Sequence, residues 1–205
     1  MSDRVNFRYY QITDRKAVGA EKQAEILKAL IAAGLRGLQI REKDLSQQKL
    51  LKFVDALLPN IGDQVSVLVN TDIEVAQARH LGLHRPERGL ATAEIRARLG
   101  PDPLIGVSCH DLEGAMQAQN TGADFITLSP VFATPGKGPA MGLEMFRKIV
   151  SQLSIPVFAL GGITAANTRS CIESGAYGIA AIRATLTAQN PVQAFLEILE
   201  EIGES

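Results

Sequence analysis

The sequence has only two cysteines and almost no excess of charge, and both shortages exclude classes of protein. Cys109 and Cys171 lie far apart and lack the spacing of metal ligands, so we expect neither a disulfide framework nor a zinc site. Lysine and arginine together number 21 against 22 acidic residues, which gives a formal net charge of -1. Such a chain has no basic field for nucleic acid or an anionic membrane surface, so neither is an expected partner.

Long hydrophobic runs are also missing. A bilayer span takes about 20 apolar residues, whereas the longest runs here, such as Val65–Val69, have the length of a strand. The segment Met1–Tyr10 is polar and charged and has no apolar centre of the kind that a secretory signal needs. We therefore expect a reducing, cytoplasmic location. At 205 residues the chain is long enough to bury a sizeable core, and we expect a single domain over residues 1–205.

What the sequence does have is a repeated pattern of short apolar runs, each followed by a segment with helical apolar spacing. Eight such units are predicted. In chain order, the expected strand and helix of each unit are Tyr9–Ile12 and Glu21–Ala33, Leu38–Arg41 and Gln47–Leu58, Val65–Val69 and Ile73–His80, Leu81–His84 and Ala93–Leu99, Leu104–Val107 and Leu112–Thr121, Phe125–Leu128 and Leu143–Leu153, Pro156–Leu160 and Asn167–Ser174, and Tyr177–Ile182 and Val192–Ile202. Thr92 is expected to be the N-cap of the fourth helix.

Strands that alternate with helices favour parallel pairing, and eight units in about 200 residues predict a single (β/α)8 TIM barrel. An open doubly wound sheet is the alternative. The Gly-x-Gly-x-x-Gly pattern typical of such sheets does not follow the first strand, which weakens that alternative.

In a barrel of this kind, reacting groups lie at the carboxyl ends of the strands and in the loops that follow. Arg41 and Lys43 follow the second strand and alternate onto the same side of an extended chain. Two cations that point into the mouth would suit a phosphate or a diphosphate. The alternative is an ion-paired surface turn with Glu42 and Asp44.

The next three strands also end in polar residues. Asn70–Asp72 either binds a ligand or caps the next helix, because Asn, Thr and Asp are common N-caps. His84 is either a general acid or base or a packing residue. Ser108 is a candidate hydrogen-bonding partner of a ligand, whereas burial is the better expectation for the neighbouring Cys109.

Two segments predict a phosphate site. Residues 129–142 form a long loop, which we interpret as a lid that closes over a ligand and carries Thr134 and Lys137. Gly161 and Gly162 follow the seventh strand, and Ile182 and Arg183 lie at the end of the eighth. Barrels commonly hold phosphate at these two strand ends, on glycine-rich turns and a short extra helix.

Taken together, these segments resemble the thiamin phosphate synthase and TenI superfamily from about Tyr9 to Ile202. The matching motifs are Ile12-Thr13-Asp14-Arg15, Gln39-Ile40-Arg41-Glu42-Lys43, Val69-Asn70, Gly106-Val107-Ser108, Gly122-Ala123-Asp124, Ser129-Pro130-Val131-Phe132-Ala133-Thr134, Gly142-Leu143-Glu144 and Gly161-Gly162-Ile163. The synthase joins a pyrimidine diphosphate to a thiazole phosphate and releases diphosphate.

The resemblance implies roles for individual residues. Arg41, Lys43 and Asn70 match the family residues that contact the pyrimidine diphosphate, and Ser108 matches the family serine after the fifth strand. Thr134 and Lys137 fall on lid positions that hold the anions, and the Gly161-Gly162 turn matches the family's phosphate turn.

The sequence also departs from the family pattern. The synthase holds magnesium with two aspartates, but Thr71 stands at the first position, and the loop Arg85–Gly89 contains no aspartate. Asp72 and Glu87 are weak substitutes, so Mg²⁺ is expected only if the protein is an active synthase. Arg183 stands where the family usually has serine.

The sister TenI branch isomerises a thiazole carboxylate phosphate and lacks those aspartates, so this sequence is predicted to be closer to TenI. The characterised histidine of that branch is replaced by Pro130, and His84 or Cys109 would have to act as the base. The alternatives are a thiamin phosphate synthase and a non-catalytic phosphate-binding protein. In each case the expected partner is a small phosphorylated molecule. The sequence leaves open whether the protein forms a homodimer.

Overall fold

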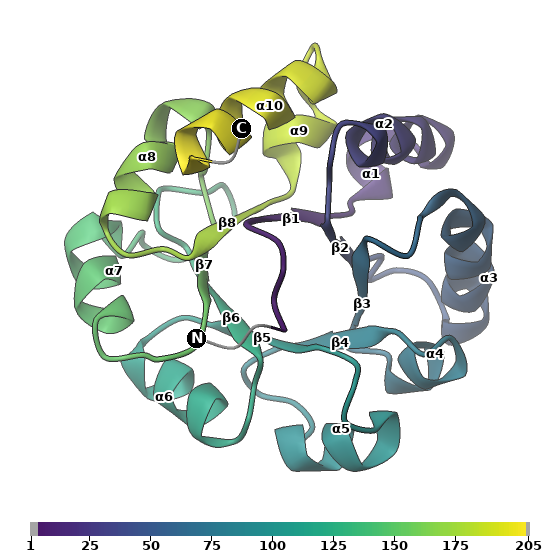
Figure 1. Cartoon of the computed structure of the whole chain (residues 1–205), viewed down its shortest axis with the longest axis horizontal. Coiled ribbons are helices and arrows are strands. Elements are labelled where there is room, and N and C mark those ends of the chain that lie inside the picture. Colours follow the sequence, from purple (N-terminus) through teal and green to yellow (C-terminus); the bar gives the residue numbers. More distant parts are fainter. Residues whose placement is uncertain (1–3, 204–205) are drawn as a thin grey trace.

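The protein is described by a computed structural model over residues 4–203. Eight parallel strands close into a barrel and helices surround it (Figure 1). The strands are β1 (Tyr9–Ile12), β2 (Gly37–Ile40), β3 (Ser66–Asn70), β4 (Gly82–Arg85), β5 (Ile105–Cys109), β6 (Phe125–Leu128), β7 (Val157–Ala159) and β8 (Gly178–Ala181). The pairing of β1 with β8 closes the barrel, which confirms the (β/α)8 prediction and excludes the open sheet.

The helices follow the strands around the outside of the barrel. They are α1 (Arg15–Val18), α2 (Ala20–Ala32), α3 (Gln47–Leu57), the 3₁₀ turn η1 (Leu58–Asn60), α4 (Ile73–Ala78), α5 (Thr92–Leu99), α6 (Leu112–Asn120), α7 (Gly142–Val150), α8 (Ala165–Glu173), α9 (Arg183–Leu186) and α10 (Pro191–Ile202). The short helix α1 has no counterpart in the prediction.

Two details of the predicted helices are wrong. The helix α7 was expected to reach Leu153 but ends at Val150, because its last turn tightens and Leu153 N donates to Val150 O. Thr92 does not cap α5; the cap position belongs to Ala91. Thr92 is instead buried, and its hydroxyl oxygen lies 3.2 Å from that of Thr121, a contact that sequence spacing does not reveal.

The amino-terminal end of the barrel is closed. The segment before β1 crosses this end (Figure 1), and its Phe7 ring packs on Tyr10 and Phe158 with ring centroids 5.3 Å away in each case. Phe125 adds an edge-on contact with Phe7 at 5.7 Å. A Cβ at Gly178 would collide with the carbonyl oxygen of Arg8, so this close approach requires glycine. A ligand therefore enters from the opposite end.

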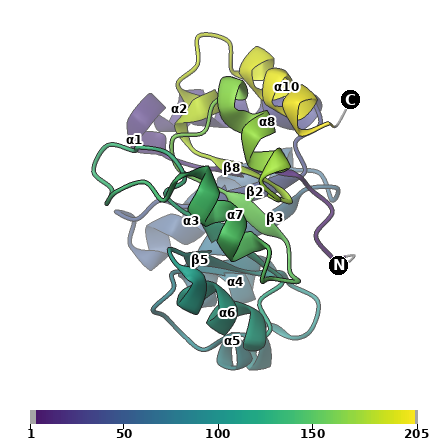
Figure 2. The same ribbon diagram turned by 90° about the vertical axis from the view of Figure 1, so that its left-hand side faces the viewer.

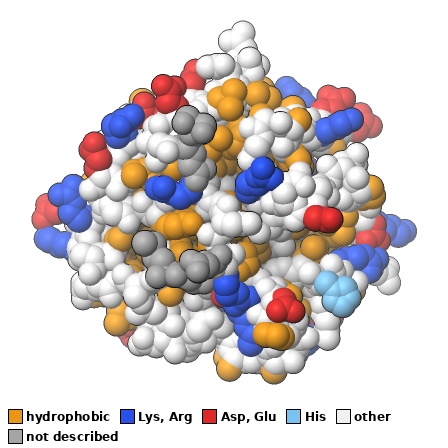
Figure 3. All heavy atoms as spheres, viewed as in Figure 1, with side chains coloured by type: hydrophobic (Ala, Val, Ile, Leu, Met, Phe, Trp, Pro, Cys, Tyr) orange, Lys and Arg blue, Asp and Glu red, His pale blue; other side chains and the backbone are white. Residues whose placement is uncertain are grey.

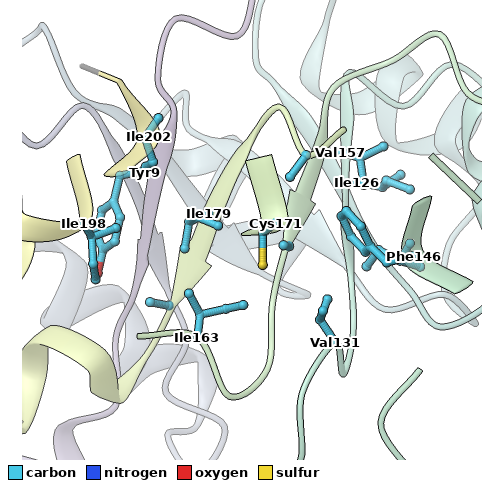
Figure 4. Packing of buried hydrophobic residues seen from close by; sticks show 14 of the residues in the cluster. Tyr9, Ile126, Val131, Phe146, Val157, Ile163, Cys171, Ile179, Ile198 and Ile202 are labelled. Carbon is cyan, nitrogen blue, oxygen red and sulfur yellow. The ribbon is translucent and has the colours of Figure 1, made fainter. Parts of the chain in front are cut away.

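A second layer of core lies between the strands and the helices. Figure 4 shows Ile126, Val157 and Ile179 from the strands facing Phe146 and Cys171 from α7 and α8. Both cysteines are free and fully buried, and burial raises the pKa of each thiol to about 12. Because a thiol with this pKa stays protonated, Cys109 does not supply a base or a nucleophile at neutral pH.

The surface agrees with the weak net charge of the sequence. On the face seen in Figure 3, lysine and arginine side chains are interspersed with aspartate and glutamate side chains, so no large field of one sign forms there. Within residues 4–203, every helix is too short or too polar to cross a bilayer.

Candidate active site

A cavity of about 580 Å³ opens at the carboxyl ends of the strands, a volume in the range of small-molecule sites. Figure 2 shows the loop before α7 and the helix α1 at this end of the barrel, with the amino terminus at the other end. All ten residues predicted for binding or catalysis line this one cavity. They are Arg41, Lys43, Asn70, Ser108, Thr134, Lys137, Gly161, Gly162, Ile182 and Arg183.

The acidic neighbours of Arg41 and Lys43 pair with other residues. Asp44 binds Arg15 with an N–O distance of 2.5 Å and lies 3.5 Å from the Lys16 ammonium. The buried Glu42 carboxylate accepts a hydrogen bond from Gln23 at 3.0 Å. The Arg15 guanidinium also lies 3.7 Å from Glu42, so both carboxylates have partners on α1 or α2. The ion-paired surface turn that the sequence allowed does not form, and the two cations of the β2 loop line the cavity.

Arg41, Lys43 and Lys137 form a cationic group that lines one side of the cavity. Within residues 4–203, no carboxylate lies within 4.0 Å of the charged nitrogens of these three residues. Repulsion from Arg41, partial burial and Lys137 together hold the pKa of Lys43 below its ordinary value. Since like charges gather only at a cost, this arrangement favours an anionic ligand.

The turn after β7 has the geometry of a backbone anion site. Gly161 and Gly162 have φ values of +99° and +66°, which favour glycine. In the described part of the chain, the N–H groups of both residues lack a hydrogen-bonding partner. The lid is attached to this turn, because Phe132 N donates to Gly161 O at 3.0 Å and Val131 N donates to Leu160 O at 2.9 Å. A movement of residues 131–132 would therefore disturb the turn at Gly161.

Arg183 lies on the β8 side of the cavity, at the start of α9. Its guanidinium is exposed and lies 4.0 Å from the carboxylate of Asp14, the only Asp or Glu among the lining residues. Asp14 also acts electrostatically on Arg41. The cavity thus contains two cationic sides, with one carboxylate that interacts with both.

Four polar side chains form a hydrogen-bonded chain across the cavity floor. Gln39 Nε2 donates to the Tyr10 hydroxyl at 3.3 Å, and this hydroxyl lies 3.4 Å from His84 Nδ1. In the His84 tautomer with its proton on Nε2, Tyr10 donates to Nδ1 and His84 donates to Ser108 Oγ at 3.0 Å. In this order of donors, the Ser108 proton is free to be donated to a ligand acceptor. The sequence pattern identified Ser108, but it did not connect this residue to Tyr10 or Gln39.

His84 is a poor general base in this setting. Burial, followed by repulsion from Arg41 and Arg85, lowers its pKa from 6.5 to about 3. The ring is therefore neutral over the physiological pH range, and the interpretation as a hydrogen-bonded packing residue agrees with its contacts better than the acid–base interpretation does.

We predict that His84 makes the protein less stable in acid. The unfolded chain takes up a proton on this ring below pH 6.5 and the folded chain does not, until about pH 3. Each decrease of one pH unit in that window lowers the free energy of unfolding by about 1.4 kcal/mol through this group. Urea denaturation at pH 7 and pH 5 should show a smaller loss for His84→Gln than for the wild type, whereas equal losses would contradict the prediction.

Thr127 also borders the cavity, and the sequence analysis missed it. It pairs in register with Ser108 across β5 and β6, and its hydroxyl is buried without a hydrogen-bonding partner in the described part of the chain. An unpaired buried hydroxyl next to a cavity is the type of group that a polar ligand atom or an ordered water would satisfy. The only signal in the sequence was a polar residue at an inward position of β6.

The residues present do not fit a magnesium ion. Asp72 caps α4, where its side chain accepts from Val75 N at 3.0 Å, and Glu87 bonds to the His110 ring at 3.2 Å. Neither of them lines the cavity. Within residues 4–203, no group of three or more His, Cys, Asp or Glu side chains is arranged to hold a metal. The two weak metal candidates from the sequence are therefore engaged with protein groups outside the cavity lining.

We predict that Asp72→Ala lowers the free energy of unfolding by about 1 kcal/mol through loss of the helix cap. The turnover that the protein catalyses should stay unchanged, because this carboxylate does not reach the cavity. Chemical denaturation and a steady-state rate measure the two effects separately. A large loss of rate in a variant of normal stability would show that Asp72 acts in the reaction after all.

The fold and the cavity define a class of protein: a (β/α)8 barrel with a cation-lined cavity at the carboxyl ends of its strands. Residues 9–185 match the family model described as thiamine monophosphate synthase, with the short name TMP-TENI. The chain therefore belongs to this thiamine-biosynthesis family, as the sequence motifs predicted.

Named relatives cover nearly the whole chain. The chain is 38% identical over 194 residues to a "Putative thiamine-phosphate synthase" of Geobacter sulfurreducens, with 92% of this chain and 91% of the relative aligned. It is 40% identical over 181 residues to a "Putative thiamine-phosphate synthase 2" of Aquifex aeolicus, which covers 85% and 95% of the two chains. The solved thiamine phosphate pyrophosphorylase from Pyrococcus furiosus superposes with a TM-score of 0.81 at 27% identity and 98% coverage of both chains.

These relatives support the superfamily and an enzyme, but they bear the synthase name. The preference for the TenI branch, which came from the missing aspartates, finds no specific support in them and stays a prediction.

Proposed function

We propose that the protein is a thiamine-phosphate synthase-type transferase, which joins a pyrimidine diphosphate to a thiazole phosphate and releases diphosphate. One observation carries the proposal: a single cavity has two cationic sides, Arg41 with Lys43 and Lys137, and Arg183 with the Gly161-Gly162 turn. Two sides of this kind suit two anionic substrates that must lie next to each other. An isomerase acting on one thiazole carboxylate phosphate would bring a phosphate and a carboxylate, but no diphosphate for the group of three cations.

The thiazole phosphate is assigned to the β7 and β8 side. There the unpaired N–H groups of Gly161 and Gly162 would donate to the phosphate oxygens, and Arg183 would add a charge. Ile182 would contribute apolar contact. Thr134 lines the same side from the lid, where its hydroxyl oxygen lies 3.2 Å from the position of a Cβ at Gly161.

The diphosphate is assigned to Arg41, Lys43 and Lys137. The pyrimidine ring is assigned to the cavity floor, between the two cationic sides. Ser108 would donate its free hydroxyl proton to an acceptor on that ring, such as a ring nitrogen. Asn70 lines the same region and donates to its neighbour Thr71 at 3.0 Å, so its amide oxygen stays available to accept from the ring's amino group. The family resemblance of Arg41, Lys43 and Asn70 supports the same assignment.

A TenI-type isomerase is the second candidate, and the lack of magnesium carboxylates at the mouth favours it. Its difficulty is the base: Pro130 replaces the branch histidine, and neither His84, with a pKa of about 3, nor the protonated Cys109 accepts a proton readily at neutral pH. A non-catalytic binding protein would keep the cavity without either reaction.

The deciding experiment supplies both substrates to the purified protein and measures diphosphate release and the coupled product. The transferase proposal expects catalytic turnover that needs both substrates. In parallel, proton NMR of the thiazole carboxylate phosphate in heavy water tests for exchange at the ring carbon. Exchange without diphosphate release would replace the transferase with the isomerase, and binding by calorimetry without either reaction would leave a binding protein.

A further inference from the structure

The balance of charge at the mouth is unusual for a site that must release diphosphate. The residues that line the cavity include four cations, Arg41, Lys43, Lys137 and Arg183, against the single carboxylate of Asp14. Mg²⁺ is bound in proteins chiefly through carboxylates together with substrate phosphates. A divalent cation entering this cavity would meet an excess of positive charge before any diphosphate is bound.

Three of the cations stand together on the side assigned to the diphosphate. All three side chains line the same cavity, and Lys43 experiences electrostatic repulsion from both Arg41 and Lys137, so the charges of the β2 loop and of the lid border one space. Arg41 is the most buried of the three, and its backbone is held by the Thr13 hydroxyl, which accepts from Arg41 N at 2.8 Å. The carboxylates that could have paired with these cations are committed to Arg15, Lys16 and Gln23.

Thr71 stands at the position of the first family aspartate, and its side chain carries no negative charge that could bind a metal ion. Its hydroxyl accepts from Asn70, and its backbone N donates to His84 O at 2.9 Å. The residue holds a φ of +69°, which is uncommon for a β-branched side chain. The loop that would carry the second carboxylate is instead held by Arg85, which donates to Glu87 O at 2.8 Å.

We propose that Arg41, Lys43 and Lys137 neutralise the diphosphate leaving group themselves, so that the transfer requires no divalent cation. This inference rests on the proposed transferase function. The thiazole ring nitrogen supplies the electron pair of the new N–C bond to the pyrimidine methylene carbon. The C–O bond to the diphosphate breaks, and the bonding electron pair stays on the diphosphate oxygen. The three cations bind the anion that departs. No proton, electron or further reactant is consumed.

The first test compares turnover of both substrates in excess EDTA with turnover in Mg²⁺, after the protein has been stripped of metal. Loss of a charge-neutralising ion slows such a step by about a hundredfold or more. The proposal therefore expects nearly equal rates in the two conditions. Turnover that collapses in EDTA and returns with Mg²⁺ would overturn this inference while leaving the transferase function intact.

The second test measures binding of inorganic diphosphate by calorimetry in EDTA. We expect binding without metal, weakened about tenfold by Lys43→Met and by Lys137→Met, because each removes one charge-assisted contact. Lys28→Met is the matched control, since Lys28 lies on the exposed face of α2, and it should bind like the wild type. If diphosphate binds only with Mg²⁺, or if all three variants bind alike, the three cations do not have this role.

The two tests separate the possible failures. Absence of turnover in both EDTA and Mg²⁺ would overturn the proposed transferase function. If diphosphate still bound in EDTA and weakened in the two lysine variants, the cationic group would be confirmed as a metal-free diphosphate site in a protein of another activity. If that binding were also lost, both the function and the inference would fall.

Discussion

Arg41→Met should lower kcat/KM for the pyrimidine diphosphate by about 10² to 10³, the effect of removing one preorganised charge from a developing anion. Arg41 is half-buried at the end of β2, so its guanidinium is less screened by water than those of exposed arginines, and its carboxylate neighbours are committed elsewhere. Burial lowers the pKa of Arg41, but the ordinary pKa of arginine is so high that the guanidinium stays charged at neutral pH. Steady-state kinetics with the thiazole phosphate saturating measures the effect.

Arg36→Met is the control for this prediction. Arg36 precedes the same strand at the opposite end of the barrel, where its side chain is exposed. The variant loses the same charge and gains the same side chain, but the loss falls on the closed end. Equal losses of rate in the two variants would indicate a general effect of net charge and would remove Arg41 from the proposed diphosphate side.

Gly161→Ala should weaken binding of the thiazole phosphate by more than about tenfold and lower the free energy of unfolding by about 2 to 3 kcal/mol. An alanine at φ +99° is strained, and its Cβ would lie 2.8 Å from the Cα of Pro130 in the lid. The collision is with backbone, which cannot rotate away. Either the turn or the lid must move, and the donated hydrogen bond from Phe132 N to Gly161 O ties the two together.

Gly122→Ala separates strain from collision. Gly122 has a similar φ of +88°, but nothing lies within 4 Å of the position of its Cβ. It follows α6, away from the cavity. We expect this variant to lose stability through strain alone, by about 1 to 2 kcal/mol, and to bind phosphate normally. Calorimetry and urea denaturation on both variants give the comparison, and normal phosphate binding by Gly161→Ala would contradict the assignment of this turn.

The periodic part of the fold could be predicted because it is local. Apolar residues at strand and helix spacing define βα units wherever they occur, and eight units in one chain of this length leave few arrangements other than a barrel. The bounds of β1 and β6 agree with the predicted ones residue for residue. The ends of other elements shifted where a tertiary contact intervened, as at Thr92, whose side chain turned inward toward Thr121.

The site was predictable in its location and less so in its contacts. Strand order places all carboxyl ends of a parallel barrel on one face, so residues that follow different strands had to meet there. Which of several neighbouring charges would face the cavity was a different question. Arg41, Glu42, Lys43 and Asp44 alternate along the chain, and the partners of the two acidic residues come from α1, at Arg15 and Lys16.

By itself, the sequence determined the repeat of strands and helices, the glycine turn at β7 and the supply of cations at the mouth, because spacing and residue type decide these features within a few residues of chain. Closure of the barrel decided which of those cations remain unpaired, and it joined Tyr10, Gln39, His84 and Ser108 from four strands into one hydrogen-bonded floor. Contacts of that kind join residues far apart in the chain, and they depend on the stagger that the strands adopt when the barrel closes.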